Sequence, residues 1–281
     1  MKIMNKYRII VDSCLDYDEE LFKNNGEFYR VPFGINIDDE NIIDRNLDTD
    51  ELINKMKNSQ GKILSAAPSP QDFLEFLSKD EANFIITVSS KLSGAYNAAC
   101  LAKNCFLDEH KDANVYVIDS KSAAAGENLL AYKLKLLLDE GKDIKAVYNE
   151  ICAIRDNMET FFVLENFSVF IRNGRISNIK SFLIDLLNIT PIMMGDDGVI
   201  KTYKKVRGKE KAYKTLIQLV NERVISKGKN VLMVTYCAAK ERANKLKEEL
   251  NKLVPNLRVM LLKAGGLSTI YANEGGIVFA I

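Results

Sequence analysis

The chain has 281 residues, of which 47% are hydrophobic and 27% are charged, and its formal net charge is +1 at pH 7. These values are typical of a globular protein with a sizeable core, and the length favours two domains or one large α/β unit. Because lysine and arginine are dispersed among aspartate and glutamate, the sequence lacks the clustered positive charge that nucleic acid binding requires.

The apolar segments and the cysteines favour a cytoplasmic protein. The apolar run at 7–11 is too short for a signal peptide, and no segment approaches the ~18 consecutive apolar residues of a membrane span, so we expect no stable membrane insertion. The odd number of cysteines and the absence of C-x-x-C spacing argue against a disulfide framework or a structural zinc site, and for reduced thiols. The cysteines are Cys14, Cys100, Cys105, Cys152 and Cys237.

Strand-like and helical segments alternate along roughly the first 160 residues. The strand-like runs are 7–11, 62–66, 84–88 and 115–119. The helical stretches are 48–58, 70–79, 95–110 and 128–141. This alternation predicts βαβ units that form a Rossmann-type parallel sheet with helices on both faces.

The rhythm changes near residue 165. The later segments comprise helical patterns at 176–187, 209–224 and 239–253, a hairpin pattern at 190–206 around GDDG, and strand patterns at 230–236, 258–263 and 276–281. They predict a smaller α/β domain with a mixed or antiparallel sheet. The fold class is therefore α/β, with an expected parallel-sheet domain at 1–165 and a second domain at 166–281.

The sequence lacks the common motifs of catalysis. There is no P-loop, no G-x-G-x-x-G after the first strand and no H-E-x-x-H. His110 is the single histidine and stands in the polar tail of a predicted helix, so neither a Ser-His-Asp triad nor a multi-histidine metal site is expected. Cys14, just after the first strand, could be a nucleophile, but no imidazole lies in its local sequence.

Three strand-to-helix junctions carry serine hydroxyls. The serines are Ser65 in the first junction, Ser89, Ser90 and Ser93 beside Gly94 in the second, and Ser120 and Ser122 in the third. In a parallel α/β sheet, ligands bind outside the carboxyl ends of strands, where helix N-termini favour anions. Serine is also among the best helix N-caps, so the pattern leaves two interpretations open, a carboxylate or other anion site and plain helix capping.

At these residues the sequence resembles the DegV family, bacterial proteins that bind a fatty acid and present it to a separate fatty acid kinase. The similar motifs occur in the family's order along nearly the whole chain. They are DS (12–13), S-x-x-P-S-P (65–70), SSKLSGAY (89–96), VIDS (117–120), NGRIS (173–177), P-I…DG…KVRGKEKA (191–212) and a glycine-bearing terminus.

The resemblance implies a long-chain fatty acid between the two domains, with its tail in an apolar tunnel covered by the second domain. Its carboxylate would bind hydroxyls of the first two serine loops, at Ser65, where the family usually has threonine, and at Ser93, with backbone N–H groups near Gly94 as helpers. The ATP-binding subunit of the kinase would be the partner. The resemblance implies no catalytic residue, cofactor or metal in this chain.

The resemblance also implies roles for two arginines and two further serines. Arg207, in KVRGKEKA, stands at the family's basic position, which is linked to the head group and to kinase docking. Arg175, in NGRIS, is linked to the kinase interface. Ser90 and Ser122 are further candidates for head-group contact. An exposed arginine that only forms weak surface ion pairs is the alternative for each arginine.

The C-terminal motif departs from the family pattern. Tyr271 stands where the family histidine would be, and a tyrosine can donate one hydrogen bond to a carboxylate but cannot act as a base near pH 7. Ala95 replaces a threonine, Asn173 replaces a glycine, and Asn273-Glu274 replaces Gly-Pro. We expect these changes to preserve fatty-acid binding and to affect presentation to the kinase more strongly.

Two alternatives come from other functional classes. The first is an enzyme that acts on a small carboxylated or phosphorylated metabolite at the same loops, with Asp12 and Asp119 as its candidates for acid-base or metal chemistry. The second is a degenerate relative that serves only as an interaction module, which the altered terminus around Tyr271 would explain.

Overall fold

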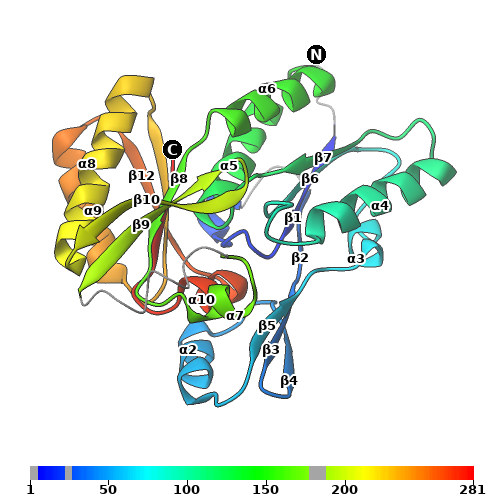
Figure 1. Ribbon diagram of the computed structural model, residues 1–281. Coiled ribbons are helices and arrows are strands. Elements are labelled where there is room, and N and C mark those ends of the chain that lie inside the picture. Colours follow the sequence, from blue (N-terminus) through cyan, green and yellow to red (C-terminus); the bar gives the residue numbers. More distant parts are fainter. Residues whose placement is uncertain (1–5, 23–26, 177–187) are drawn as a thin grey trace.

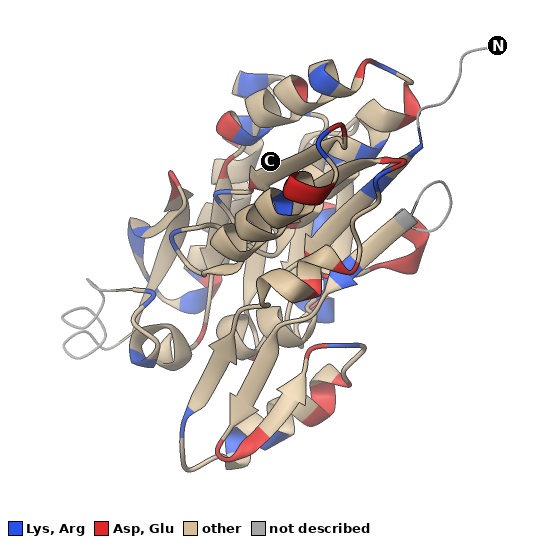
Figure 2. Cartoon of the chain, turned by 90° about the vertical axis from the view of Figure 1, so that its right-hand side faces the viewer, with Lys and Arg blue, Asp and Glu red and all other residues tan. Residues whose placement is uncertain are grey.

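The computed structural model of the chain describes residues 6–22, 27–176 and 188–281. These residues form three sheets, of four, three and six strands (Figure 1). Along the ribbon in Figure 2, lysine and arginine positions (blue) are interspersed with aspartate and glutamate positions (red). None of the described helices is long and apolar enough to cross a membrane.

The N-terminal sheet is entirely parallel, as predicted. Its strands, in order across the sheet, are β2 (Glu27–Val31), β1 (Tyr7–Asp12), β6 (Ala82–Thr87) and β7 (Val115–Asp119). Side chains alternate between its faces, and both faces are buried: Ile10 packs toward one helical layer, and Ile9 and Val11 pack toward the other. This burial on both sides explains why the strands read as continuous apolar runs.

Helices cover both faces of this sheet. Helices α3 (Pro70–Leu74) and α4 (Ala95–Glu109) contribute to the core on one face, while α5 (Ala125–Asp139) and α6 (Ile144–Asp156) contribute to the core on the other. Pro70 occupies the first turn of α3, behind the N-cap Ser69. Helix α6 was not predicted.

The strand predicted at 62–66 forms, but its expected place in the parallel sheet is wrong. As β5 (Ile63–Ala66), it pairs antiparallel with β3 (Gly34–Ile37), which also pairs antiparallel with β4 (Glu40–Ile43). The two unpredicted strands are short, and a two-residue turn that starts at Asp38, with φ of 54°, joins them. Asp-Asp is a weaker hairpin signal than Asn-Gly or Asp-Gly, so the sequence does not reveal this sheet.

The C-terminal sheet is mixed, in agreement with the prediction. Its strands, in order, are β10 (Val199–Arg207), β9 (Ile189–Asp196), β8 (Thr160–Val163), β13 (Ile277–Ala280), β11 (Val231–Tyr236) and β12 (Arg258–Lys263). Only the β11–β12 pair is parallel among these described strands. Strand β8 precedes the expected boundary at residue 165, which stays a prediction.

Helix α5 lies between the two large sheets. Its residues Leu130 and Leu134 pack toward the N-terminal sheet, whereas Leu129 and Tyr132 pack with residues of the C-terminal sheet. Helices α8 (Lys209–Lys227) and α9 (Lys240–Leu253) cover the opposite face of the C-terminal sheet, on the left in Figure 1. The inner face of that sheet is therefore left for α5 and for the cavity described below.

Of the remaining helices, α1 (Glu19–Phe22) packs against β2, where Phe22 stacks on Phe28, and the other three lie close to the small sheet. They are α2 (Thr49–Asn58), α7 (Ser168–Arg172) and α10 (Gly266–Ala272). Asp48 caps α2 by accepting hydrogen bonds from the backbone N–H groups of Asp50 and Glu51. Helix α10 was not predicted, because its glycine and β-branched residues have low helix propensity. The predicted helix at 176–187 lies outside the described residues, apart from Ile176.

Candidate functional site

A largely apolar cavity lies between the inner face of the C-terminal sheet and the carboxyl ends of the N-terminal strands. It contains about 870 Å³ of space not filled by protein atoms, including its open mouth. Its apolar lining comes from strands of the C-terminal sheet, from α7 and α10, and from loops that include those after the N-terminal strands. The larger apolar side chains are Phe33, Val88, Leu92, Phe162, Leu164, Phe170, Val199, Ile200, Leu267 and Val278. This lining suits an apolar small molecule.

One side of the cavity carries a set of half-buried polar residues that we call the donor cluster: Ser65, Ser93, Asn173, Arg175 and Tyr271. A series of hydrogen bonds connects four of them, and a further bond joins Arg175 to the residue before Ser93. Ser65 Oγ lies 2.8 Å from Tyr271 Oη, and Asn173 Nδ2 donates to the same Tyr271 oxygen at 3.4 Å. Arg175 Nη1 donates to the Asn173 carbonyl at 2.6 Å, and Arg175 Nε donates to the carbonyl of Leu92, next to Ser93, at 3.3 Å.

The donor cluster has hydrogens to spare. Ser65 and Tyr271 each own one hydroxyl hydrogen, and a single hydrogen bond joins them, so one of the two hydrogens is left for a ligand whichever residue donates. Ser93 Oγ accepts from the backbone N–H of Ala95 at 3.2 Å, and its own hydrogen has no acceptor among the described residues. The cluster therefore offers donors from two separate hydroxyl groups.

Arg175 adds a positive charge to this set. Its guanidinium uses two of its five N–H groups on backbone carbonyls. No carboxylate in the described ranges forms an ion pair with it, so its charge is available to an anionic ligand. A half-buried arginine beside unused hydroxyl hydrogens is an arrangement that favours a carboxylate over a neutral polar group.

Ser122 lines the same cavity but belongs to a different polar pair. Its Oγ lies 2.7 Å from Thr160 Oγ1, and both residues are buried. The neighbouring Lys121 also lines the cavity, but its ammonium pairs with Asp197 at 2.8 Å and with Asp156 at 3.3 Å. Because these carboxylates already neutralise Lys121, the Ser122 region is a poorer carboxylate site than the donor cluster.

Three predicted site residues do not line the cavity. Gly94 is exposed at the start of α4 with an ordinary φ of −76°, and Ser90 uses its backbone N–H on Asp119 Oδ1 at 3.1 Å. Arg207 is exposed at the end of the edge strand β10. The structure thus brings Ser65, Ser93, Ser122, Arg175 and Tyr271 to one cavity and leaves these three outside its lining.

Asp12 and Asp119, the candidates for acid-base chemistry, both accept hydrogen bonds from backbone N–H groups. The buried carboxylate of Asp12 accepts from the N–H groups of Cys14 and Val88 at 2.9 and 2.8 Å, while burial raises its pKa to about 7. Asp119 Oδ1 accepts from the N–H groups of Ser90 and Lys121. Neither aspartate lines the cavity.

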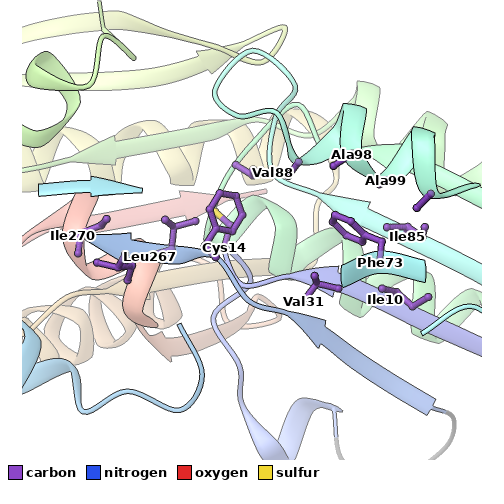
Figure 3. Packing of buried hydrophobic residues seen from close by; sticks show 14 of the residues in the cluster. Ile10, Cys14, Val31, Phe73, Ile85, Val88, Ala98, Ala99, Leu267 and Ile270 are labelled. Carbon is purple, nitrogen blue, oxygen red and sulfur yellow. The ribbon is translucent and has the colours of Figure 1, made fainter. Parts of the chain in front are cut away.

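Cys14 and His110 also lack the surroundings of catalytic groups. Cys14 does line the cavity, between Val88 and Leu267 (Figure 3). Burial raises the pKa of its thiol well above the usual value, so the thiolate form of a nucleophile is disfavoured. His110 follows the last turn of α4, where its ring packs against Phe106.

Sequence reasoning missed several residues of the cavity. Phe33 follows a strand that was not predicted, and Thr160 and Phe162 belong to β8, which crosses into the C-terminal sheet. The apolar run TFFV was visible in the sequence as a possible buried strand. Nothing in the sequence indicated that its side chains would face the serine loops.

Comparisons with known proteins agree with this architecture. The family model described as "Uncharacterised protein, DegV family" matches residues 6–281. A DegV domain-containing protein of Streptococcus pneumoniae is 31% identical over 277 residues, which cover 97% of each chain.

Solved structures are similar over nearly the same length. A DegV family protein of Ruminococcus gnavus, refined with vaccenic acid, has a TM-score of 0.92 and 33% identity over 98% of this chain and 99% of that one. The fatty acid kinase B3 protein of Streptococcus pneumoniae, loaded with linoleic acid, has a TM-score of 0.88 and 29% identity over 98% of both chains. The resemblance inferred from the sequence motifs is confirmed, and this chain belongs to the DegV family.

Proposed function

We propose that this chain binds one long-chain fatty acid, with the acyl tail in the apolar cavity and the carboxylate at the donor cluster. The observation that carries this proposal is the surplus of donors in that cluster. Two hydroxyl hydrogens and the unused N–H groups of Arg175 outnumber the cluster's unused acceptor, the buried Oδ1 of Asn173. A carboxylate supplies acceptors only, and therefore complements them.

The energetics support this orientation of the ligand. A carboxylate that leaves water must recover several hydrogen bonds or an ion pair, because an unpaired buried charge is very costly. The donor cluster offers both, whereas the remaining lining is dominated by aliphatic and aromatic side chains. Each buried methylene of the tail contributes about 0.8 kcal/mol, so a long chain gains most of its affinity from the apolar part.

The relatives support a fatty acid as the ligand. The Ruminococcus gnavus protein was refined with vaccenic acid, and the Streptococcus pneumoniae fatty acid kinase B3 protein was loaded with linoleic acid. Both are at least 29% identical to this chain over nearly its full length. By that similarity we assign Ser65, Ser93, Arg175 and Tyr271 to the head group, with residues 1–165 supplying its serine loops and residues 166–281 covering the tail.

We further propose that the bound fatty acid is presented to a separate ATP-dependent kinase, which forms the acyl phosphate. The kinase name of the Streptococcus pneumoniae relative supports this role. Arg207 fits docking better than ligand binding, because it is exposed on β10 and absent from the cavity lining. In this scheme the chain is a non-catalytic carrier whose phosphorylation chemistry resides in its partner.

An enzyme of small-metabolite chemistry has less support. Its two candidate aspartates organise loops by accepting backbone N–H groups, and neither reaches the cavity. Turnover of a small carboxylated or phosphorylated metabolite by the purified chain, abolished by Asp12→Asn, would restore that alternative.

Lipid extraction of the purified native chain, followed by mass spectrometry, tests the carrier function. The expected result is about one long-chain fatty acid per chain. A delipidated chain should also take up a labelled fatty acid in a saturable manner. The proposal fails if no acyl chain is extracted and the labelled fatty acid does not bind.

A further inference from the structure

A group of buried carboxyl groups lies behind the floor of the cavity, where β1 ends and α5 begins. Asp12, Asp16, Asp44 and Glu127 are all at most 1% exposed. Arg30 Nη2 lies 3.5 Å from Asp44 Oδ1. The positive charge of Arg30 also lowers the pKa of Asp12, Asp16 and Glu127, against the larger effect of burial. One guanidinium therefore serves four carboxyl groups, and further positive charge is needed if all four are ionised.

Three of the four carboxyl groups have hydrogen-bond donors on both oxygens. Asp12 accepts from two backbone N–H groups. Asp16 accepts from Gly265 N at 2.8 Å and from Thr235 Oγ1 at 2.6 Å. Asp44 accepts from Ser13 Oγ and Leu267 N through one oxygen and faces Arg30 with the other. These carboxylates are integrated into the fold.

Glu127 is the exception among these four. It is 0% exposed, and the Cys14 thiol is the one side-chain donor beside its carboxyl oxygens within the described residues; no backbone N–H group or other side chain donates to them. Its closest ligand-type neighbours are Cys14 Sγ and an Asp12 oxygen, and one such atom from each of the three residues lies within 4.8 Å of the others. A buried carboxyl group with only a thiol donor is costly unless something else supplies positive charge or a proton.

We propose that Asp12, Cys14 and Glu127 form a binding site for one thiophilic divalent cation of the Zn²⁺ class. A thiol and two carboxyl groups are the ligand types that Zn²⁺ accepts, and the sulfur disfavours Mg²⁺ and Ca²⁺. With Zn–S near 2.3 Å and Zn–O near 2.0 to 2.2 Å, a tetrahedral ion holds its ligand atoms about 3.5 Å apart, so the three side chains, whose ligand atoms lie within 4.8 Å of one another, would have to draw together around the ion.

The cation would compensate the charge or the missing hydrogen bonds of all three ligands. It would supply a stronger partner for Glu127, add positive charge to the acidic group, and bind the Cys14 sulfur as a thiolate, because a coordinating thiol loses its proton. The absence of C-x-x-C spacing does not count against this site, since its ligands come from β1, the loop after it and α5. Cys14 lines the cavity, which gives an ion a path to the group.

Metal titration of the full-length chain tests the proposal. The chain, stripped with a chelator, is titrated with Zn²⁺ in competition with a chromophoric chelator, and then with Co²⁺ to detect the thiolate-to-cobalt charge-transfer band. We expect saturable binding of one Zn²⁺ per chain. Glu127→Gln should weaken it by more than about a hundredfold, since even the loss of an outer-shell partner costs 10- to 100-fold.

The cysteine variants identify the sulfur ligand. Cys14→Ser should remove the charge-transfer band, and Cys237→Ser, which changes another buried thiol, should keep both the band and the affinity. The proposal is overturned if the unaltered chain shows no stoichiometric Zn²⁺ binding, a result that does not depend on how any variant folds. It is equally overturned if Glu127→Gln and Cys14→Ser bind Zn²⁺ as the unaltered chain does.

Discussion

The donor cluster lies at the cavity and the buried acidic group lies behind the cavity floor. The first has more hydrogen-bond donors than acceptors, and the second has more acceptors than donors. At the donor cluster, Arg175 and the hydroxyls of Ser65 and Ser93 offer hydrogens that the protein does not use. Around Glu127, carboxyl oxygens outnumber the donors, and two of them have no donor but the Cys14 thiol within the described residues. One region is complementary to an anion and the other to a cation.

The difference between the two regions lies in exposure. The donor cluster is half-buried, so its unused hydrogens can bind water until a ligand replaces it. The acidic group is fully buried, so water offers it no equivalent compensation. An imbalance that is inexpensive at the mouth of a cavity is therefore costly behind its floor, and the two regions should respond differently to substitution.

The largest expected effect is at Arg175. Arg175→Ala should weaken fatty-acid binding by about 2 to 5 kcal/mol, because it removes the charged partner of a partly desolvated carboxylate. Displacement of a fluorescent fatty acid measures the affinity. Arg172→Ala, on the same short segment but exposed, is the matched control and should bind normally. Equal affinity of the Arg175 and Arg172 variants would remove the cation from the head-group site.

Substitutions of Ser65 and Tyr271 should have non-additive effects on the fatty-acid affinity. In Ser65→Ala, Tyr271 still has a hydrogen to donate to the ligand, and in Tyr271→Phe, Ser65 does. Each single variant should therefore bind nearly normally, while the double variant should lose about 1.5 to 3 kcal/mol. Isothermal titration calorimetry of the four proteins measures the coupling. Additive losses would mean that each hydroxyl contacts the carboxylate independently.

Ser93 should contribute a smaller amount by itself. Ser93→Ala should weaken fatty-acid binding by about 1.5 kcal/mol, the lower part of the range for a hydrogen bond to a charged group, without unfolding the chain. Ser122→Ala is the matched control, since Ser122 lines the same cavity but bonds to Thr160. Unchanged affinity in Ser93→Ala would leave Ser93 with the Ala95 N–H as its only role.

The smallest effect concerns docking. Arg207→Ala should leave the fatty-acid affinity unchanged and should raise the KM of a fatty acid kinase for the loaded chain about 1.4- to fivefold, as expected for an exposed charge worth about 0.2 to 1 kcal/mol. Kinase assays with varied concentrations of the loaded chain measure this. A loss of fatty-acid affinity in Arg207→Ala would instead make this arginine part of the ligand site.

The sequence predicted the parallel sheet and the mixed sheet because most of their strands are clear apolar runs, although β2 and β8 were missed. It did not predict the small sheet, whose strands are four residues long, or α10, which forms where tertiary packing overrides weak helix propensity. Tyr271 was expected at the site only from the family resemblance. The structure adds its bond to Ser65, a contact between residues 206 positions apart.

The buried acidic group shows the limit of sequence reasoning most clearly. Asp12 and Cys14 were noticed as separate residues at the end of a strand, whereas Glu127 gave no signal, because a glutamate in the first turn of a helix normally interacts with the helix dipole and solvent. Only the packing of α5 against β1 reveals that this carboxyl group is buried and without a backbone donor.

The most direct test of the carboxylate site compares a long-chain fatty acid with the fatty alcohol of the same chain length. Both fill the apolar cavity, but only the acid offers a charged acceptor to the donor cluster. We predict that the unaltered chain binds the acid about 10- to 150-fold more tightly, the equivalent of 1.5 to 3 kcal/mol, and that Arg175→Ala removes most of this preference. Equal affinities of the unaltered chain for acid and alcohol would contradict the assignment of the carboxylate to this cluster.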